Sequence, residues 1–89
     1  MVQAPPRPVA PTKPLKVFRN RGISASVFEN HSRNDGRDVT FHKVSLQRTY
    51  KDGDEFKTTN SFSRDDLPVA RHVLQQAWEF ILNLEAHRD

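Results

Sequence analysis

The segment from Phe41 to Phe62 alternates polar and apolar residues, turns once, and alternates again. It reads FHKVSLQRTYKDGDEFKTTNSF, and the turn lies at KDGD. A period of two is typical of a strand with one buried face, and a short connection that contains glycine joins such strands into a hairpin. The segment therefore predicts an antiparallel hairpin and restricts the chain to folds that contain a sheet.

Alternation assigns the side chains of the first strand of this hairpin to two faces. One face is expected to supply the core and carries His42, Val44, Leu46, Arg48 and Tyr50. The other face mixes aromatic, cationic, hydroxyl and amide groups, and carries Phe41, Lys43, Ser45, Gln47 and Thr49. The second composition fits either a solvated sheet surface or a binding platform, and the residues alone leave both interpretations open.

The rest of the chain completes a small α+β fold. Two further strands and a helix are predicted, giving a curved four-stranded antiparallel meander followed by one long C-terminal helix, ββββα. The strands are expected at residues 16–19, 23–30, 39–50 and 55–62, and the helix at residues 68–84. Asn34-Asp35-Gly36 and KDGD supply turn chemistry, and Gly22 indicates a turn or a bulge. Ser63 to Asp66 and Pro68 are typical of a helix start.

Both ends are expected to lie outside this domain, which spans residues 15–85. Residues 1–14 hold five of the six prolines, which favours a disordered basic arm that is either a passive tail or a contact for an acidic partner. Residues 86–89 are expected to be frayed. With 89 residues, no cysteine and no apolar run near 18 residues, the chain is predicted to be a soluble cytoplasmic protein with no membrane segment.

Charge is distributed unevenly along the chain. Residues 1–21 contain five cations and no acid, whereas the remainder has nine cations and eleven acids. A uniformly basic nucleic-acid module would differ from this pattern, unless charges of one sign are gathered on one face.

The predicted helix is apolar over roughly 220°, about twice the width of a single-contact stripe. A central stripe is flanked by Val69, Val73 and Phe80 on one side and by Trp78 and Leu82 on the other. A second neighbour is therefore expected, and it is predicted to be a second subunit, with the curled sheet itself as the alternative. In the first case the predicted dimer interface is Val69, Val73, Phe80 and Leu84.

No pattern of catalytic or metal-ligating residues is found. The four histidines are dispersed, and His42 shares a face with Val44 and Leu46, which favours a packed histidine over a base. The three glycines lie in turns and form no phosphate-binding loop. We therefore expect no enzyme activity, no cofactor, no metal and no small-molecule substrate.

The strand layout resembles the single-stranded-DNA-binding domain of the transcriptional coactivator positive cofactor four and its bacterial relatives, which are related in fold to the Whirly proteins. The resemblance is carried by KVFRNRGISASVFEN, VTFHKVSLQRTY, EFKTTNSFSRDDLP and VARHVLQQAWEFIL, and it covers residues 16–84. The chain also resembles small bacterial proteins of unknown activity with the same ISAS-V-EN and VSLQR-Y patterns. The resemblance to the coactivator implies a homodimer that binds single strands on its sheets, with contacts at Phe28, Phe41, Lys43, Gln47 and Lys57.

The sequence thus predicts a non-enzymatic module that binds single-stranded nucleic acid, DNA rather than RNA, on the open sheet face with help from the basic arm. The expected contacts are Arg19, Arg21, Phe28, Phe41, Lys43, Gln47 and Lys57. Lys57 belongs to this set only if Phe56 and Phe62 point toward the core. The alternative is a protein-interaction module that does not bind nucleic acid.

Overall fold

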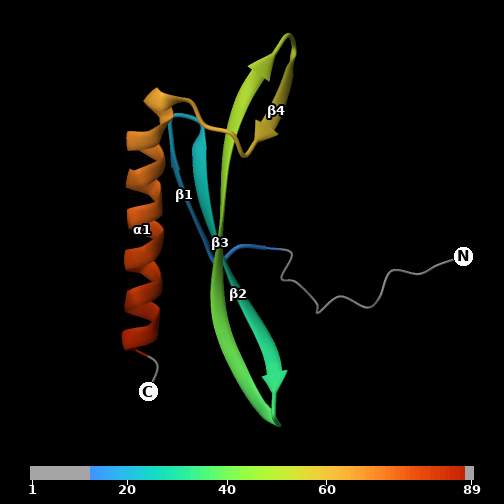
Figure 1. The fold of residues 1–89 in the computed structure, drawn as a ribbon, viewed down its shortest axis with the longest axis vertical. Coiled ribbons are helices and arrows are strands. Elements are labelled where there is room, and N and C mark those ends of the chain that lie inside the picture. Colours follow the sequence, from blue (N-terminus) through green and yellow to red (C-terminus); the bar gives the residue numbers. More distant parts are fainter. Residues whose placement is uncertain (1–12, 88–89) are drawn as a thin grey trace, which may run out of the picture.

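The computed structural model describes residues 13–87, and these residues form one antiparallel sheet and one long helix (Figure 1). The predicted ββββα layout is confirmed. The sheet has the order β1-β2-β3-β4. The elements are β1 (Lys16–Asn20), β2 (Ile23–Asn34), β3 (Arg37–Asp52), β4 (Glu55–Thr59), a short 3-10 helix (Arg64–Asp66) and α1 (Leu67–Ala86). The expectations for residues 1–12 and 88–89 lie outside the described residues.

Two-residue turns connect the strands. Arg21-Gly22 and Asp35-Gly36 have positive φ at both positions, as type I′ turns require, and Gly53 has φ 64 at the first position of the third turn. Such tight turns let the ladder continue to the turn itself, so β2 and β3 pair as far as Asn34 and Arg37. The eight-residue loop expected after residue 30 is therefore wrong, and both strands are longer than predicted.

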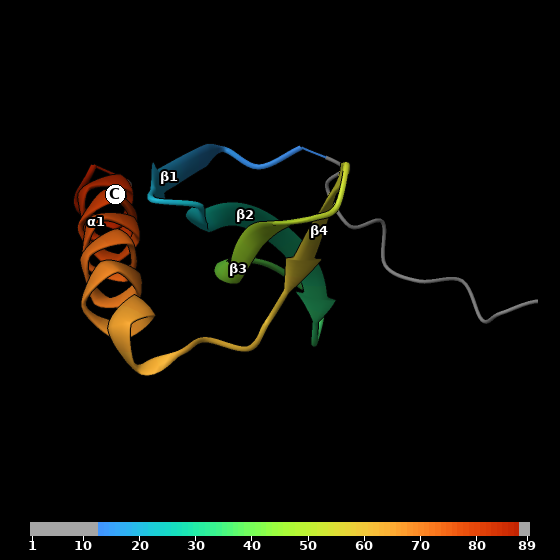
Figure 2. The ribbon, with the colours of Figure 1, turned by 90° about the horizontal axis from the view of Figure 1, so that it is seen from above.

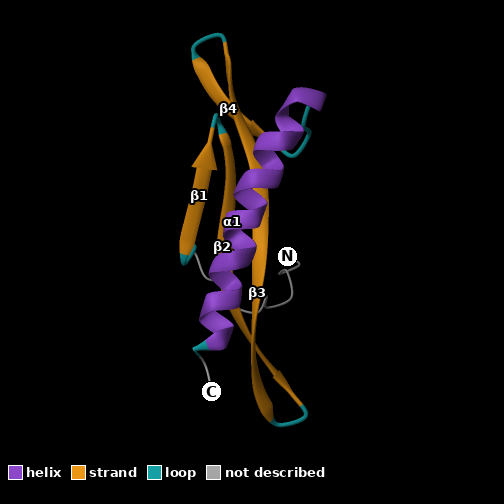
Figure 3. Ribbon diagram, turned by 90° about the vertical axis from the view of Figure 1, so that its left-hand side faces the viewer, coloured by secondary structure: helices purple, strands orange, loops and turns teal. Residues whose placement is uncertain are grey.

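The pairing along β3 is continuous. Its first part pairs with β2 and its last part pairs with β4, with Arg48 in both ladders. No residue is skipped in either register, so the described ladders contain no bulge and alternation holds along the length of β3. The β2–β3 hairpin extends past one end of α1, and the β3–β4 hairpin extends past the other (Figures 1 and 3).

The core lies between α1 and the first two strands. The buried side chains are Ile23, Ala25 and Val27 of β2 and Ala70, Val73 and Ala77 of α1. At the β1 edge, the rings of Phe18 and Phe80 meet edge to face with centroids 6.0 Å apart. Seen along its axis, the helix lies beside β1 and β2 (Figure 2). The core is small, and half of its buried residues are alanines.

The third strand contributes less to the core than expected. Leu46 packs at the margin of the core, but Val44 is 38% exposed and Tyr50 is 36% exposed. The reason is the position of α1, which covers β1 and β2 and leaves the inner side of β3 at its edge (Figure 2). The expected face is correct, but the expectation that Val44 and Tyr50 supply the core is wrong.

Hydrogen bonds and an ion pair hold the start of α1. The carboxylate of Asp66 accepts from the backbone N–H and from the hydroxyl of Ser63, each at 2.9 Å, and lies 3.2 Å from Nε of Arg48. The Ser63 backbone, the Ser63 hydroxyl and, more weakly, the Arg48 charge together lower the pKa of Asp66 against an opposing effect of burial. The helix then continues to Ala86, two residues past the predicted end.

One flank of α1 remains exposed. Its large apolar side chains, here called the apolar helix flank, are Leu67, Leu74, Trp78 and Leu82. The sheet does not curl around to cover them, although this was one of the two expected arrangements. The residues predicted as a dimer interface lie elsewhere: Val73 is fully buried in the core, Val69 and Phe80 pack against the core, and Leu84 is half-buried.

Candidate nucleic-acid interface

Alternation along the paired strands gives the sheet a helix-side face and an open face. Ile23, Ala25 and Val27 point toward α1, so their neighbours Ser24 and Ser26 point away from it. Residues paired across the ladder share a face, which extends the assignment to the other strands. The open face carries Arg19 of β1, Ser24, Ser26 and Phe28 of β2, Arg37, Phe41, Lys43, Ser45, Gln47, Thr49 and Lys51 of β3, and Phe56 and Thr58 of β4.

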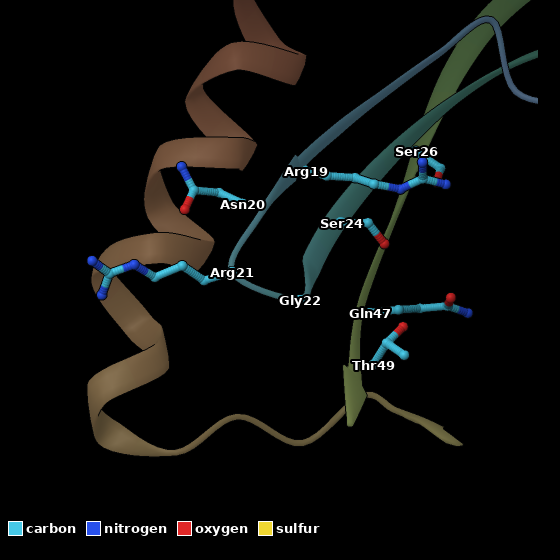
Figure 4. A pocket seen from close by; sticks show the side chains of 8 residues that line it. All are labelled: Arg19, Asn20, Arg21, Gly22, Ser24, Ser26, Gln47 and Thr49. Carbon is cyan, nitrogen blue, oxygen red and sulfur yellow. The ribbon is translucent and has the colours of Figure 1, made fainter. Parts of the chain in front are cut away.

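Five of the seven predicted contact residues share the open face. They are Arg19, Phe28, Phe41, Lys43 and Gln47. Arg21 does not join them, because it lies in the β1–β2 turn and its side chain points away from Ser24 and Gln47 (Figure 4).

Lys57 lies on the opposite face, where it is paired with Tyr50 across the ladder and with Asp52 at 2.9 Å between Nζ and Oδ2. Its prediction required Phe56 to point inward. Instead, Phe56 lies opposite Lys51 on the open face and is 73% exposed. Lys51 and Phe56, like Arg37, are thus open-face residues that sequence reasoning did not select. The sequence contained the information needed to place them, because a two-residue turn at Gly53-Asp54 pairs Phe56 with Lys51.

Charges of opposite sign are separated between the two faces. The acidic residues of the strands all lie on the helix-side face, at Glu29, Asp38, Asp52 and Glu55. The open face of the described strands carries cations only, at Arg19, Arg37, Lys43 and Lys51. Among residues 13–87, none of these four cations has an ion-pair partner. The excess of acids over cations after residue 21 therefore does not apply to the open face, which is positively charged.

Aromatic rings lie among these cations. Nζ of Lys43 is 5.7 Å from the centroid of the Phe41 ring, within the range of a cation–π contact. Phe28 is paired with Lys43 across the ladder, so it lies diagonal to Phe41 on the same face. Phe41 and Phe56 are both exposed, and their rings are available to a ligand.

A hollow of about 420 Å³ lies on the open face beside the β1–β2 turn. Arg19, Ser24, Ser26, Gln47 and Thr49 line it from three strands, and their polar atoms lie on its side of the sheet (Figure 4). The turn closes onto β3 through a hydrogen bond of 2.8 Å from the backbone N–H of Thr49 to the carbonyl of Gly22.

Gly22 is required at the edge of this hollow. Its φ is +80°, and a Cβ atom there would lie 3.0 Å from the carbonyl oxygen of Thr49. The tight approach of the turn to β3 therefore depends on the absence of a side chain.

A carboxylate and two histidines form a separate cluster on the helix-side face. The two carboxylate oxygens of Glu29 lie 3.3 Å from Nε2 of His31 and 3.3 Å from Nε2 of His42. The His42 side chain is only 3% exposed, which confirms the prediction of a packed histidine. Within residues 13–87, no group of three or more potential ligands is arranged to hold a metal ion.

Comparisons with protein-family models, curated proteins and solved structures found no match to the chain. In the described part of the chain, no helix combines the length and the apolar character needed to cross a membrane.

Proposed function

We propose that this chain is a non-enzymatic module that binds single-stranded nucleic acid on the open face of its sheet. The observation that carries the proposal is the segregation of charge: the open face of the described strands presents four cations and no acid. A polyanion would meet no repelling carboxylate there, whereas the helix-side face has as many strand acids as it has lysines and arginines.

Exposed rings direct the proposal toward single strands. Phe41 and Phe56 present accessible faces on which unpaired bases stack, at about 1–3 kcal/mol for each base. Bases in a duplex are already stacked on one another and are unavailable for such contacts. Cations follow the phosphates in either case, so the rings are what favours a single strand over a duplex.

The proposal takes DNA as the strand, on the resemblance of layout to the single-stranded-DNA-binding domain of positive cofactor four. The Pro-rich arm, with Arg7 and Lys13, is proposed to add positive charge to the same complex.

The test is a fluorescence-anisotropy titration with a labelled single-stranded oligonucleotide. Replacing Phe41 and Lys43 together by alanine should weaken binding well over tenfold, because a stacking contact and a phosphate contact, each about 1 kcal/mol or more, are lost. The matched control replaces Tyr50 and Lys57, an aromatic and a lysine on the opposite face, and should bind like the wild type. No binding by the wild-type protein at low salt, or equal loss in both double variants, would contradict the proposal.

We also propose a homodimer, because the apolar helix flank has no cover within the described protomer. Trp78 is 57% exposed at the centre of this flank, and Val44 continues the apolar surface onto β3. Exposed patches of this kind mark interaction sites in small proteins. A second copy would bury the flank across a twofold axis and would enlarge a core that has only six buried residues in each protomer.

Trp78 is the only tryptophan and reports directly on this interface. In a dimer, its emission should shift to shorter wavelength as protein concentration rises, together with an increase in mass by light scattering. Leu74→Glu, which keeps Trp78 as the reporter, should abolish both changes, whereas His72→Glu on the polar side of α1 should not. A monomer at tens of micromolar with an unchanged emission spectrum would contradict the dimer and would favour a different protein partner on the same flank.

A further inference from the structure

We propose that the hollow beside the β1–β2 turn binds one internal phosphodiester group, with Arg19 as its cation and with hydroxyl and amide groups as its neutral donors. The inference rests on the proposed function, since it assigns the ligand strand a fixed point on the open face. It adds selectivity for one kind of phosphate group, which stacking on rings and attraction to lysines do not provide.

The lining of the hollow matches an oxyanion. Arg19 supplies a planar fork of donors, which suits phosphate oxygens, and its side chain extends over the hollow toward Ser26 (Figure 4). The hydroxyls of Ser24, Ser26 and Thr49 and the amide of Gln47 each donate a hydrogen bond without adding charge. Within residues 13–87, none of these five side chains has a hydrogen-bond or ion-pair partner in the protein.

Charge balance selects a diester over a terminal phosphate. Arg19 and Arg21 both line the hollow, but the Arg21 side chain extends away from Ser24 and Gln47, so within residues 13–87 Arg19 is the one lining cation whose side chain extends over it (Figure 4). An internal phosphodiester carries one negative charge, whereas a terminal phosphate carries about 1.5 to 2 at neutral pH. One guanidinium therefore neutralises the diester and leaves the monoester undercompensated.

The hollow and the Phe41 ring lie far apart along β3. Gln47 and Phe41 are separated by six residues of β3, or about 20 Å at ~3.3 Å per residue. At a rise of ~3.4 Å per nucleotide, as in one strand of a duplex, about six nucleotides would span this distance, and fewer would do so in a more extended strand. Affinity should therefore rise with oligonucleotide length up to roughly six nucleotides and then level off.

The experiment compares Arg19→Gln with Arg71→Gln, a variant with the same charge change at an exposed position on α1. Binding of a labelled single-stranded oligonucleotide of about 12 nucleotides is titrated at several salt concentrations. Arg19→Gln should bind roughly tenfold more weakly at low salt, and its slope of log K against log salt should be shallower by about 0.7, the contribution of one phosphate contact. Gln47→Ala, which leaves the charge unchanged, should weaken binding without changing the slope.

Failure of the inference is distinguishable from failure of the proposed function. If the wild type binds and Arg19→Gln behaves like Arg71→Gln, the hollow binds no phosphate and the open-face proposal survives. If the wild type does not bind, the proposed function itself fails. Adding a 5′-phosphate to the oligonucleotide should leave affinity unchanged, and a gain of more than about fivefold, or ~1 kcal/mol, would overturn the internal diester in favour of a strand end.

Discussion

The helix-side face and the open face of the sheet are built from the same strands, yet they differ in charge and in packing. On the helix-side face, cations and acids are balanced, and several are paired, as Lys57 with Asp52 and Arg33 with Asp38. On the open face the cations of the described strands have no acidic neighbour on the same face. Successive residues of a strand point to opposite faces. The net charge summed along the chain therefore combines the two faces and hides the difference in charge between them.

The two faces also differ in role. Residues of the helix-side face stabilise the fold, whereas residues of the open face are free to bind a ligand. The helix-side face holds half of the buried core, and its cations are used in contacts such as that of Arg48 with Asp66. In the described part of the chain, the open face contributes no residue to the buried core and exposes rings and lysines. Substitutions on the two faces should therefore change different quantities, namely stability on one face and ligand affinity on the other.

Charge reversal is expected to have the largest effect. Replacing Lys43 and Lys51 of the open face by glutamate should reduce affinity for a single-stranded oligonucleotide roughly a hundredfold, because two charge-assisted contacts of about 1.5 kcal/mol each are lost. Replacing Lys16 and Lys57 in the same way should change affinity less than about fivefold, since both lie on the face opposite the proposed binding surface. Anisotropy titrations of both variants check this, and equal losses would remove the distinction between the faces.

Adjacent residues on β2 allow the corresponding test of stability. Val27 is fully buried against α1, whereas Ser26 is half-buried on the open face. Val27→Ala should lower the free energy of unfolding by about 2 kcal/mol, from lost apolar contact and a residual cavity. Ser26→Ala should change it by less than about 0.5 kcal/mol. Urea denaturation measures both values, and a similar loss for the two variants would show that the core does not lie where the structure places it.

Two equally exposed aromatic residues of β3 provide a sharper comparison. Phe41 is 37% exposed on the open face and Tyr50 is 36% exposed on the helix-side face. Phe41→Ala should weaken single-strand binding about tenfold, near the lower part of the 1–3 kcal/mol range for stacking on a base. Tyr50→Ala should leave it unchanged. The titration is best made at high salt, where screening reduces the contribution of the cations, and a greater loss from Tyr50→Ala would reverse the assignment of the faces.

The smallest effect is expected from the carboxylate at the start of α1. The pKa of Asp66 is lowered in the folded state, so its stabilising contribution is fully present above the ordinary aspartate pKa of about 3.9 and is lost as pH falls through the lower folded value. Asp66→Asn should therefore reduce the urea midpoint near pH 7 and leave a smaller difference from the wild type near pH 2. Oligonucleotide binding near pH 7 should not change, and a larger effect of the substitution in acid would contradict this account.

Local sequence signals predicted much of the fold. Alternation of Val44, Leu46 and their neighbours and the turn at KDGD gave the hairpin and its two faces, and the spacing from Pro68 onward gave the helix. The error at Lys57 came from orienting β4 by the apolar character of Phe56. Turn length was the stronger constraint, because a two-residue loop pairs Phe56 with Lys51 whatever its hydrophobicity.

The packing of the helix was not predictable from its own pattern. Its apolar arc is wide, and periodicity does not say which part of a wide arc meets the sheet. In the structure the small residues Ala70 and Ala77, with Val73, allow close approach to β2, and the bulkier Leu74 and Trp78 remain outside. The dimer interface predicted around Val73 lies on the part of the apolar arc that packs against the sheet of the same protomer.

The most direct test of binding on the open face is an NMR titration of the wild-type protein with a single-stranded oligonucleotide, following side-chain resonances. The ring signals of Phe28, Phe41 and Phe56 and the side-chain amide of Gln47 should shift together in proportion to bound ligand. The side-chain amide of Gln75, which donates a hydrogen bond to Glu79 on the polar side of α1, should stay in place. Shifts confined to residues 1–14, with the open-face side chains unmoved, would contradict the account.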